Sequence, residues 1–206
     1  MTKKNNLINK SGREIRSFSS FELKELRSDN GDTQDYVHGV PVVFNTPTCI
    51  YEYEGVKFYE VIDRHAFDNC DMSDVIFNYN HGGRVAARLR NNTLKLALND
   101  VCMEMDAFLG GTNFGRDLLE DIRGGYIDKM CFAFVVAADG EEYDPATHTR
   151  TITRIKKLYD VSAVDIPAYD TTSISARDFF SVEYEKEKRA LEQAKLREIC
   201  IAKSKI

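Results

Sequence analysis

Four histidines and five cysteines are the side chains of this 206-residue chain that could support nucleophilic catalysis. A thiol or hydroxyl nucleophile needs a base within hydrogen-bond reach, and usually a third group that orients the base. The cysteines are odd in number and widely spaced, with no C-x-x-C pair and no histidine at zinc-ligand spacing. We therefore expect a reducing environment, no disulfide framework, no metal and no cofactor.

His81 stands out among the histidines. It lies in FNYNHGG, at the end of an apolar stretch, where two glycines open space and two asparagines offer hydrogen bonds. By contrast, His38 lies inside a Val-rich stretch, His65 opens a turn or short helix, and His148 lies in the polar loop DPATHT. These three are interpreted as structural. From its spacing alone, His81 could be a catalytic base or another structural residue.

Cys131 and Asp160 are the two other candidates, and both lie in apolar stretches that are typical of strands. In IDKMCFAFVVA, residues 127–137, large side chains alternate with small ones, and Cys131 belongs to the small face. That position suits either burial or reactivity. Asp160, in KLYDVSAVDIP, shares a face with Ser162 and Val164. A carboxylate turned inward is costly unless it is paired, so the alternative for Asp160 is an edge position facing water.

Short apolar stretches with turn residues between them must position these side chains. About eight strands are expected, among them 13–18, 36–44, 56–62, 75–79, 93–98, 101–108, 127–137 and 157–165. One internal helix is expected at 113–123, with Gly124 and Gly125 ending it. The predicted fold is α+β and mainly β, with a closed or partly open antiparallel β-barrel core flanked by helices.

The composition suits one folded domain with extensions at both ends. With 43% apolar residues, 12 Phe and 10 Tyr, the chain can bury a proper core. We predict a flexible arm over 1–12, a main domain over 13–176, and a charged helix or tail over 177–206. The formal charge is −5 without a basic stripe, and no apolar run approaches membrane-spanning length. Nucleic acid and membrane are therefore not expected as direct partners, and a cytosolic setting is expected.

Several segments, in order over about 160 residues, resemble one family. They are REIRSF at Arg13–Phe18, VHGVPVVFN at Val37–Asn45, YEVIDRHAF at Tyr59–Phe67, DVIFNYNH at Asp74–His81, RLRNNTLKLALND at Arg88–Asp100, GRDLLEDIRGGYIDKMCFAF at Gly115–Phe134, and LYDVSAVDIPAYDTT at Leu158–Thr172. Together these segments resemble the prohead (capsid) maturation proteases of tailed bacteriophages. That family's fold resembles the herpesvirus capsid protease, assemblin, and the same fold is therefore expected here.

The resemblance assigns catalytic roles to three residues. The family's Asn-His pair carries the base, which implies that role for His81. Its nucleophile is a serine in a Met-Ser-Phe strand, and here the position holds Cys131. The third member is an acidic residue before Val-Ser, which implies Asp160, although glutamate is the commoner residue there. A thiol paired with imidazole is easily deprotonated, so cysteine is a chemically reasonable replacement. A natural nucleophile, an engineered replacement and a sign of lost activity all remain open for Cys131.

The resemblance also implies a function and its partners. The expected activity is that of an endopeptidase which cuts the scaffold segment of the major capsid protein, and probably itself, through an acyl-enzyme. The expected place of action is the host bacterial cytoplasm, inside the assembling prohead, and the resemblance implies a homodimer. The alternative is a catalytically inactive scaffold or capsid-assembly protein that keeps the protease fold. A fold alone does not decide between an enzyme and such a protein.

Overall fold

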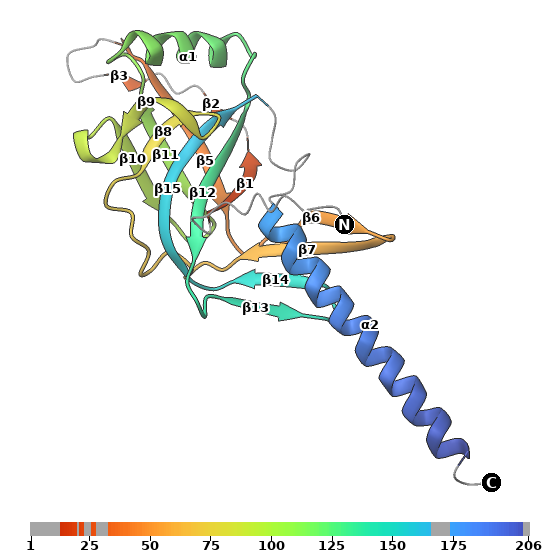
Figure 1. Ribbon diagram of the computed structural model, residues 1–206. Coiled ribbons are helices and arrows are strands. Elements are labelled where there is room, and N and C mark those ends of the chain that lie inside the picture. Colours follow the sequence, from red (N-terminus) through yellow and green to blue (C-terminus); the bar gives the residue numbers. More distant parts are fainter. Residues whose placement is uncertain (1–12, 20, 23–25, 28–32, 166–173, 204–206) are drawn as a thin grey trace, which may run out of the picture.

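The computed structural model describes residues 13–19, 21–22, 26–27, 33–165 and 174–203. In this part of the chain the protein is mainly β, with two α-helices (Figure 1). The class predicted from the sequence, α+β and mainly β, is confirmed. The strands form one five-stranded sheet, two four-stranded sheets and a two-stranded sheet, β3 (Leu26–Arg27) with β4 (Thr33–Gln34).

Cys131 and Asp160 lie in the five-stranded sheet, and His81 lies directly beside it. Its order is β1, β12, β15, β8, β9. The strands are β1 (Glu14–Ser19), β12 (Lys129–Val136), β15 (Ile155–Val164), β8 (Ile76–Tyr79) and β9 (Gly82–Arg88), and the 3-10 turn η1 (Leu89–Asn91) follows β9. Most residues of β12 and of the second half of β15 are buried.

A second sheet and the first helix enclose the main hydrophobic core. This sheet has the order β10 (Leu94–Leu98), β11 (Cys102–Phe108), β5 (Tyr36–Val43) and β2 (Phe21–Glu22). Helix α1 (Asn113–Arg123) buries Leu118, Leu119 and Ile122 in the same core. The Thr112 hydroxyl caps the helix by accepting a hydrogen bond from the Gly115 amide at 2.9 Å. The predicted helix range is confirmed.

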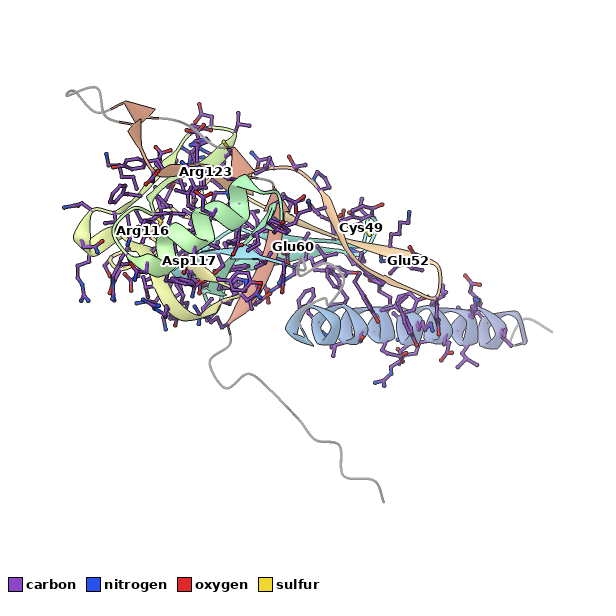
Figure 2. The ribbon with its side chains drawn as sticks, turned by 90° about the horizontal axis from the view of Figure 1, so that it is seen from above. Cys49, Glu52, Glu60, Arg116, Asp117 and Arg123 are labelled. Carbon is purple, nitrogen blue, oxygen red and sulfur yellow. The ribbon has the colours of Figure 1, made fainter. Side chains whose placement is uncertain are left out.

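The third sheet supports the C-terminal helix. Its order is β13 (Glu141–Asp144), β14 (Thr149–Ile152), β7 (Val56–Ile62) and β6 (Thr48–Tyr53). Helix α2 (Ile174–Lys203) packs on this sheet through Phe180, whose ring centroid lies 5.1 Å from that of Phe58. The second half of α2 runs away from the sheets, as Figure 2 shows from above. Its large apolar side chains, Leu191, Leu196, Ile199 and Ile201, are exposed.

The predicted barrel is not confirmed. The described strands form separate sheets, and none of these sheets closes on itself. A strand has only two hydrogen-bonding edges, and those of β12 pair with β1 and β15. Strand β5 therefore packs against β1 and β12 while its ladder hydrogen bonds go to β11 and β2. Two ladders, β7 with β14 and β8 with β15, are parallel, although an antiparallel arrangement was expected. The resemblance to assemblin stays a prediction.

Most predicted strand ranges agree with the structure to within two residues, but six strands were missed. Three of them, β2, β3 and β4, have only two residues each. In the other three, β6, β9 and β13, polar or glycine residues interrupt the apolar pattern. Strand β15 begins at Ile155, two residues before the predicted strand 157–165. Helix α2 begins at Ile174, three residues before the predicted start of the charged helix or tail at 177. The arm predicted over 1–12 lies outside the described residues.

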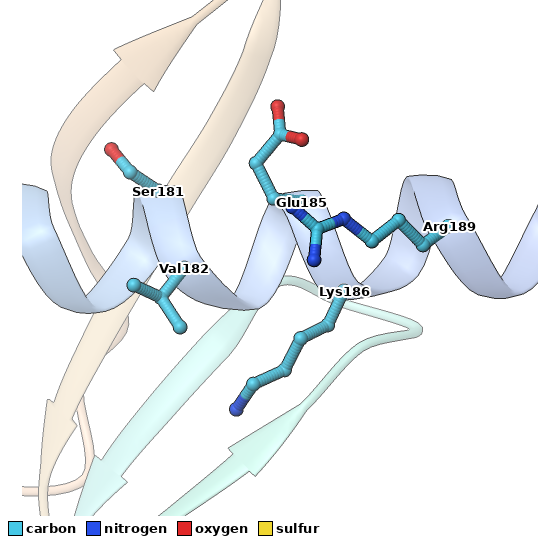
Figure 3. Close-up of a pocket in the computed structure, with 5 residues that line it drawn as sticks. All are labelled: Ser181, Val182, Glu185, Lys186 and Arg189. Atoms are coloured by element: carbon cyan, nitrogen blue, oxygen red, sulfur yellow. The ribbon is translucent and has the colours of Figure 1, made fainter.

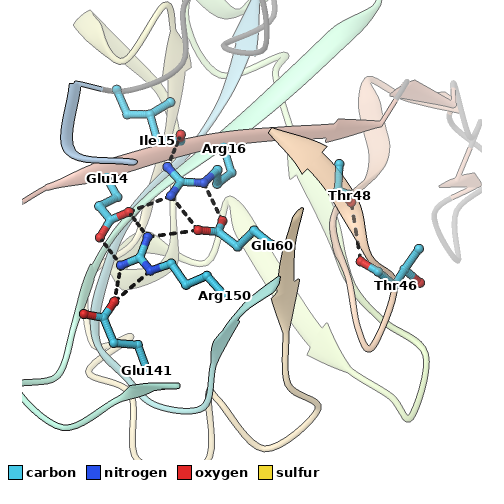
Figure 4. A network of polar contacts seen from close by, with 8 residues as sticks. All are labelled: Glu14, Ile15, Arg16, Thr46, Thr48, Glu60, Glu141 and Arg150. Carbon is cyan, nitrogen blue, oxygen red and sulfur yellow. Dashed lines mark hydrogen bonds and ion pairs between the residues drawn. The ribbon is translucent and has the colours of Figure 1, made fainter. Parts of the chain in front are cut away.

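Strand β1 is anchored by a buried network of charged side chains (Figure 4). The Arg16 guanidinium donates to Glu14 at 2.6 Å and to Glu60 at 2.7 Å. Arg150 donates to Glu14 and Glu60 at 2.9 Å, and to Glu141 at 2.7 Å. These five residues come from β1, β7, β13 and β14, so the network joins the five-stranded sheet to the sheet that carries α2.

Candidate active site

The register of the five-stranded sheet places Cys131 in a row of small polar residues. Cys131 on β12 pairs with Ser162 on β15, and Ser162 in turn pairs with Asn78 on β8. Residues that are directly opposite each other in a ladder point to the same face. Asp160 is two residues before Ser162 and therefore shares this face. Three strands thus contribute side chains to one polar patch within a buried sheet.

The hairpin turn between β8 and β9 brings His81 to this patch. Tyr79 pairs with Gly82, so Asn80 and His81 are the two loop residues. Both have positive φ, 49° and 56°, as in a type I′ turn. The Asn80 amide donates to the Ala163 carbonyl at 2.9 Å and so ties the turn to β15. Residues other than glycine adopt this conformation at an energetic cost, which is characteristic of functional turns.

His81 and Asp160 form a close pair. His81 Nδ1 lies 2.7 Å from Asp160 Oδ1, and the carboxylate is fully buried. Burial of the imidazole acts to lower the pKa of His81, but the hydrogen bond to Asp160 and the neighbouring Cys131 thiol outweigh it. The pKa rises to about 9. The carboxylate therefore both orients the ring and stabilises its charged form.

The other ring nitrogen of His81, Nε2, is not used by Asp160. His81 Nε2 is buried and makes no hydrogen bond of standard geometry to any described residue. The Cys131 thiol is nevertheless close enough to contribute to the raised pKa of His81. Cys131 itself is only 1% exposed. A substrate carbonyl must therefore displace part of what covers the sulfur before it can react.

Two residues that hold Asp160 were not singled out from the sequence as functional. The Ser162 hydroxyl lies 2.7 Å from Asp160 Oδ1 and also contacts the Asn78 amide. Because a serine hydroxyl has one proton, donation to Asp160 requires that Asn78 present its amide NH₂ to Ser162. The Arg13 guanidinium forms an ion pair with Asp160 Oδ2. The position of Ser162 two residues after Asp160 was a usable signal, but nothing in the sequence links Arg13 to Asp160.

The remaining histidines do not join this group. Nδ1 of His38 lies 2.8 Å from Asp106 across the β5–β11 ladder, and His65 pairs with Asp68 at the surface. His148 lies 3.3 Å from the Tyr143 hydroxyl, beneath α2. Their interpretation as structural residues therefore fits their positions. Among the other cysteines, Cys49 is exposed, and Cys70 and Cys102 are half-buried. The side chain of Cys200, in α2, lies outside the described part.

A surface hollow on α2 is unrelated to this group (Figure 3). It is lined by Ser181, Val182, Glu185, Lys186 and Arg189, all from one helix. None of the three candidate residues contributes to it. The candidate active site is therefore the polar patch of the five-stranded sheet. It brings together a thiol, an imidazole and a carboxylate, the three kinds of group that nucleophilic catalysis requires.

Comparison with known proteins gives a family and a similar fold. Residues 21–187 match the family described as Caudovirus prohead serine protease. The chain belongs to this family. Among solved structures, the bacteriophage T4 capsid assembly protease, gp21, has a similar fold, with a TM-score of 0.51. The two chains are 12% identical over 75% of this chain and 98% of the T4 protein. No curated protein matches the chain.

Membership in the prohead serine protease family supports a protease that acts in capsid maturation. The family is named for a serine, whereas the residue beside His81 in this chain is Cys131. In the described residues, neither α1 nor α2 is long and apolar enough to cross a membrane.

Proposed function

We propose that this chain is a prohead maturation endopeptidase that uses Cys131 as nucleophile, His81 as base and Asp160 as orienting acid. The observation that carries the proposal is the arrangement of the His81 ring: Nδ1 lies on Asp160, Nε2 is buried and not bonded to Asp160, and the Cys131 thiol is close enough to raise the pKa of His81. A triad requires this orientation, because the carboxylate fixes the tautomer and leaves the other nitrogen for proton transfer.

The reaction is peptide hydrolysis in two steps. The Cys131 sulfur attacks the scissile carbonyl after its proton passes to His81 Nε2, and the raised pKa of His81 favours this thiolate–imidazolium pair. His81 then returns the proton to the amine as the C–N bond breaks, which leaves a thioester on Cys131. Water hydrolyses the thioester with His81 as general base and restores the thiol. Asp160 remains ionised throughout and stabilises the imidazolium.

The proposed substrates are the scaffold segment of the major capsid protein and the C-terminal segment of this chain, cut inside the assembling prohead. The half of α2 beyond Lys188 supports this role, because its apolar side chains are exposed and available to a protein partner. The homodimer implied by the resemblance to assemblin belongs to the same proposal. Sedimentation of the purified chain tests it, and a monomer at all concentrations would contradict it.

A catalytically inactive assembly protein with the same fold is the second candidate function. The burial of Cys131 favours it, because buried structural cysteines are inert, whereas reactive ones have access to their substrate. The two candidates differ in one measurable outcome, the size of the capsid protein.

Co-expression with a candidate capsid protein, followed by intact mass spectrometry, distinguishes the two functions. The unchanged chain is expected to shorten the capsid protein, whereas Cys131→Ala leaves it at full length. Cys131→Ser, which restores the nucleophile type of the family, is expected to retain slower cleavage. Cys102→Ala is the matched control, since Cys102 is a half-buried strand cysteine outside the patch, and it should cut normally. Cleavage by Cys131→Ala would exclude the proposed nucleophile.

A further inference from the structure

The two faces of strand β1 are turned to different parts of the molecule. Glu14 and Arg16 point into the buried network shown in Figure 4. Ile15, between them, pairs with Ala133, which in turn pairs with Asp160. Because side chains alternate along a strand, Arg13 continues the Ile15 face, the face of Asp160. Ala133 is the residue between β1 and Asp160 in this row, and its small side chain leaves room for a guanidinium to pass.

A β-bulge in β15 places Tyr159 beside Arg13. The pairs Ala133–Asp160 and Phe134–Leu158 leave Tyr159 as the extra residue of β15. Bulges near active sites redirect side chains. The Arg13 guanidinium carbon lies 4.5 Å from the centroid of the Tyr159 ring, and its Nη2 pairs with Asp160 Oδ2. The Arg13 side chain is 28% exposed, so the pair joins the buried carboxylate to the edge of the sheet.

We propose that Arg13 is a positioning residue of the active site, which holds the Asp160 carboxylate in its orientation toward His81. Asp160 has two oxygens, and each has its own partner. Oδ1 accepts from His81 and Ser162, and Oδ2 from Arg13. Strand β1 is in turn held in place by Glu14 and Arg16, which belong to the buried network. Through Arg13, this strand therefore helps to position Asp160. A role of Arg13 in catalysis rests on the proposed function. The effect of the Arg13 charge on the pKa of His81 does not depend on that function.

The charges around Asp160 predict in which direction the pKa of His81 changes when Arg13 is replaced. The titratable groups that face Asp160 are His81 from the β8–β9 turn, Cys131 from β12 and Arg13 itself, and Tyr159 faces Arg13. A charged side chain within about 4–6 Å shifts the pKa of its neighbour by about 1–3 units. Loss of the Arg13 charge leaves His81 as the remaining charged partner of the Asp160 carboxylate. The pKa of His81 is therefore expected to rise.

The test uses Arg13→Gln, the conservative Arg13→Lys and the control Arg88→Gln. Arg88 is 33% exposed, lies in the same sheet and pairs with Asp74, so it matches Arg13 without touching the patch. The NMR titration of the His81 ring is expected to move up by about one unit or more in Arg13→Gln. Arg13→Lys should restore most of the shift, and Arg88→Gln should leave the titration unchanged.

The second readout is the pH profile of capsid-protein cleavage. In Arg13→Gln the acidic limb is expected to move to higher pH, with a loss of about tenfold near neutral pH. If the wild type cuts nothing while the His81 titration still shifts, the proposed function fails and the positioning role stands. Unchanged titration and an unchanged acidic limb in a folded Arg13→Gln would overturn the role of Arg13.

A double-mutant cycle protects the test against simple loss of folding. If Arg13 acts through Asp160, then Arg13→Gln should lower the thermal midpoint and the cleavage rate of the wild type by clearly more than in an Asp160→Asn background, where only the contact with Tyr159 is lost. Equal effects of Arg13→Gln in both backgrounds would contradict the proposal, because they would show that Arg13 acts independently of the carboxylate.

Discussion

The molecule contains two clusters of buried charge that differ in how completely they are hydrogen-bonded. In the network of Glu14, Arg16, Glu60, Glu141 and Arg150, no buried side-chain nitrogen or oxygen lacks a partner among the described residues. In the patch around Asp160, two buried nitrogens lack one, Arg13 Nε and His81 Nε2. They are the only such atoms in the described part of the chain.

This difference is the one expected between a structural cluster and the proposed active site. A buried polar group without a partner is costly, and a structural network therefore satisfies its members. Leaving His81 Nε2 without a hydrogen bond lowers the stability of the fold. Proton transfer, however, requires this nitrogen to be available. The positive φ of His81 adds strain at the same residue. We expect substitutions in the patch to change activity more than stability, and substitutions in the network to do the reverse.

The largest effect on activity is expected for His81→Asn. Asparagine tolerates the left-handed backbone of this turn, so the change removes the base without adding strain. Cleavage should fall by about a hundred- to ten-thousandfold. The exposed His65→Asn is the control and should cut normally. Rates on one capsid-protein substrate check this, and normal cleavage by His81→Asn would place the base elsewhere.

The largest effect on stability is expected for Arg150→Met. The Arg150 side chain is 4% exposed, and its loss leaves Glu14 and Glu60 with one guanidinium between them. Breaking such a buried pair costs about 3–5 kcal/mol of unfolding free energy. Urea unfolding measures this loss. Arg154→Met is the control, because Arg154 is 44% exposed and pairs with the exposed Asp139, and it should have little effect. Equal losses of unfolding free energy in Arg150→Met and Arg154→Met would show that the buried network stabilises the protein no more than an exposed ion pair does.

The two clusters should also lose their stabilisation at opposite ends of the pH range. The pKa of His81 is raised from 6.5 to about 9, so its contribution is complete below about pH 6.5 and is lost as pH rises through 9. For Glu14, burial acts to raise the pKa, but Arg150 and Arg16 lower it from 4.5 to about 2. Its contribution is present above pH 4.5 and is lost as pH falls through 2.

Urea unfolding of three proteins tests both directions. The advantage of wild type over His81→Asn, up to about 3 kcal/mol, should shrink between pH 6 and pH 9.5. The advantage over Glu14→Gln should instead shrink as pH falls from 5 to 2. Differences that stay constant with pH would mean that these groups do not titrate as described.

The smallest effect is expected for Ser162→Ala. This change removes one hydrogen bond to Asp160, while His81 and Arg13 still hold the carboxylate. A hydrogen bond to a charged group is worth about 1.5–3 kcal/mol, so a loss of about tenfold in cleavage is expected. Ser73→Ala, which removes an exposed serine–carboxylate contact with Asp71, should have no effect. A loss as large as that of His81→Asn would make Ser162 a direct participant.

Part of the candidate site follows from the sequence. The alternation of 127–137 places Cys131 on the small face of a strand, and the glycines after His81 mark the end of another strand. The ranges of β7 and α1 agree with the apolar periodicity, because periodicity is a local property of the chain. The resemblance to prohead proteases added the roles of His81, Cys131 and Asp160.

Tertiary structure decided what lies far apart in sequence. Arg13 and Asp160 are 147 residues apart, and only the ladder from β1 through β12 to β15 brings them together. Glu60 and Arg150 lie in strands with no local sign of partners, and the parallel β7–β14 pairing makes them partners. Local sequence decides on which face of its own strand a side chain lies. The register between strands decides which residues of the neighbouring strands it lies opposite. That register depends on packing over the whole core, which no single segment contains.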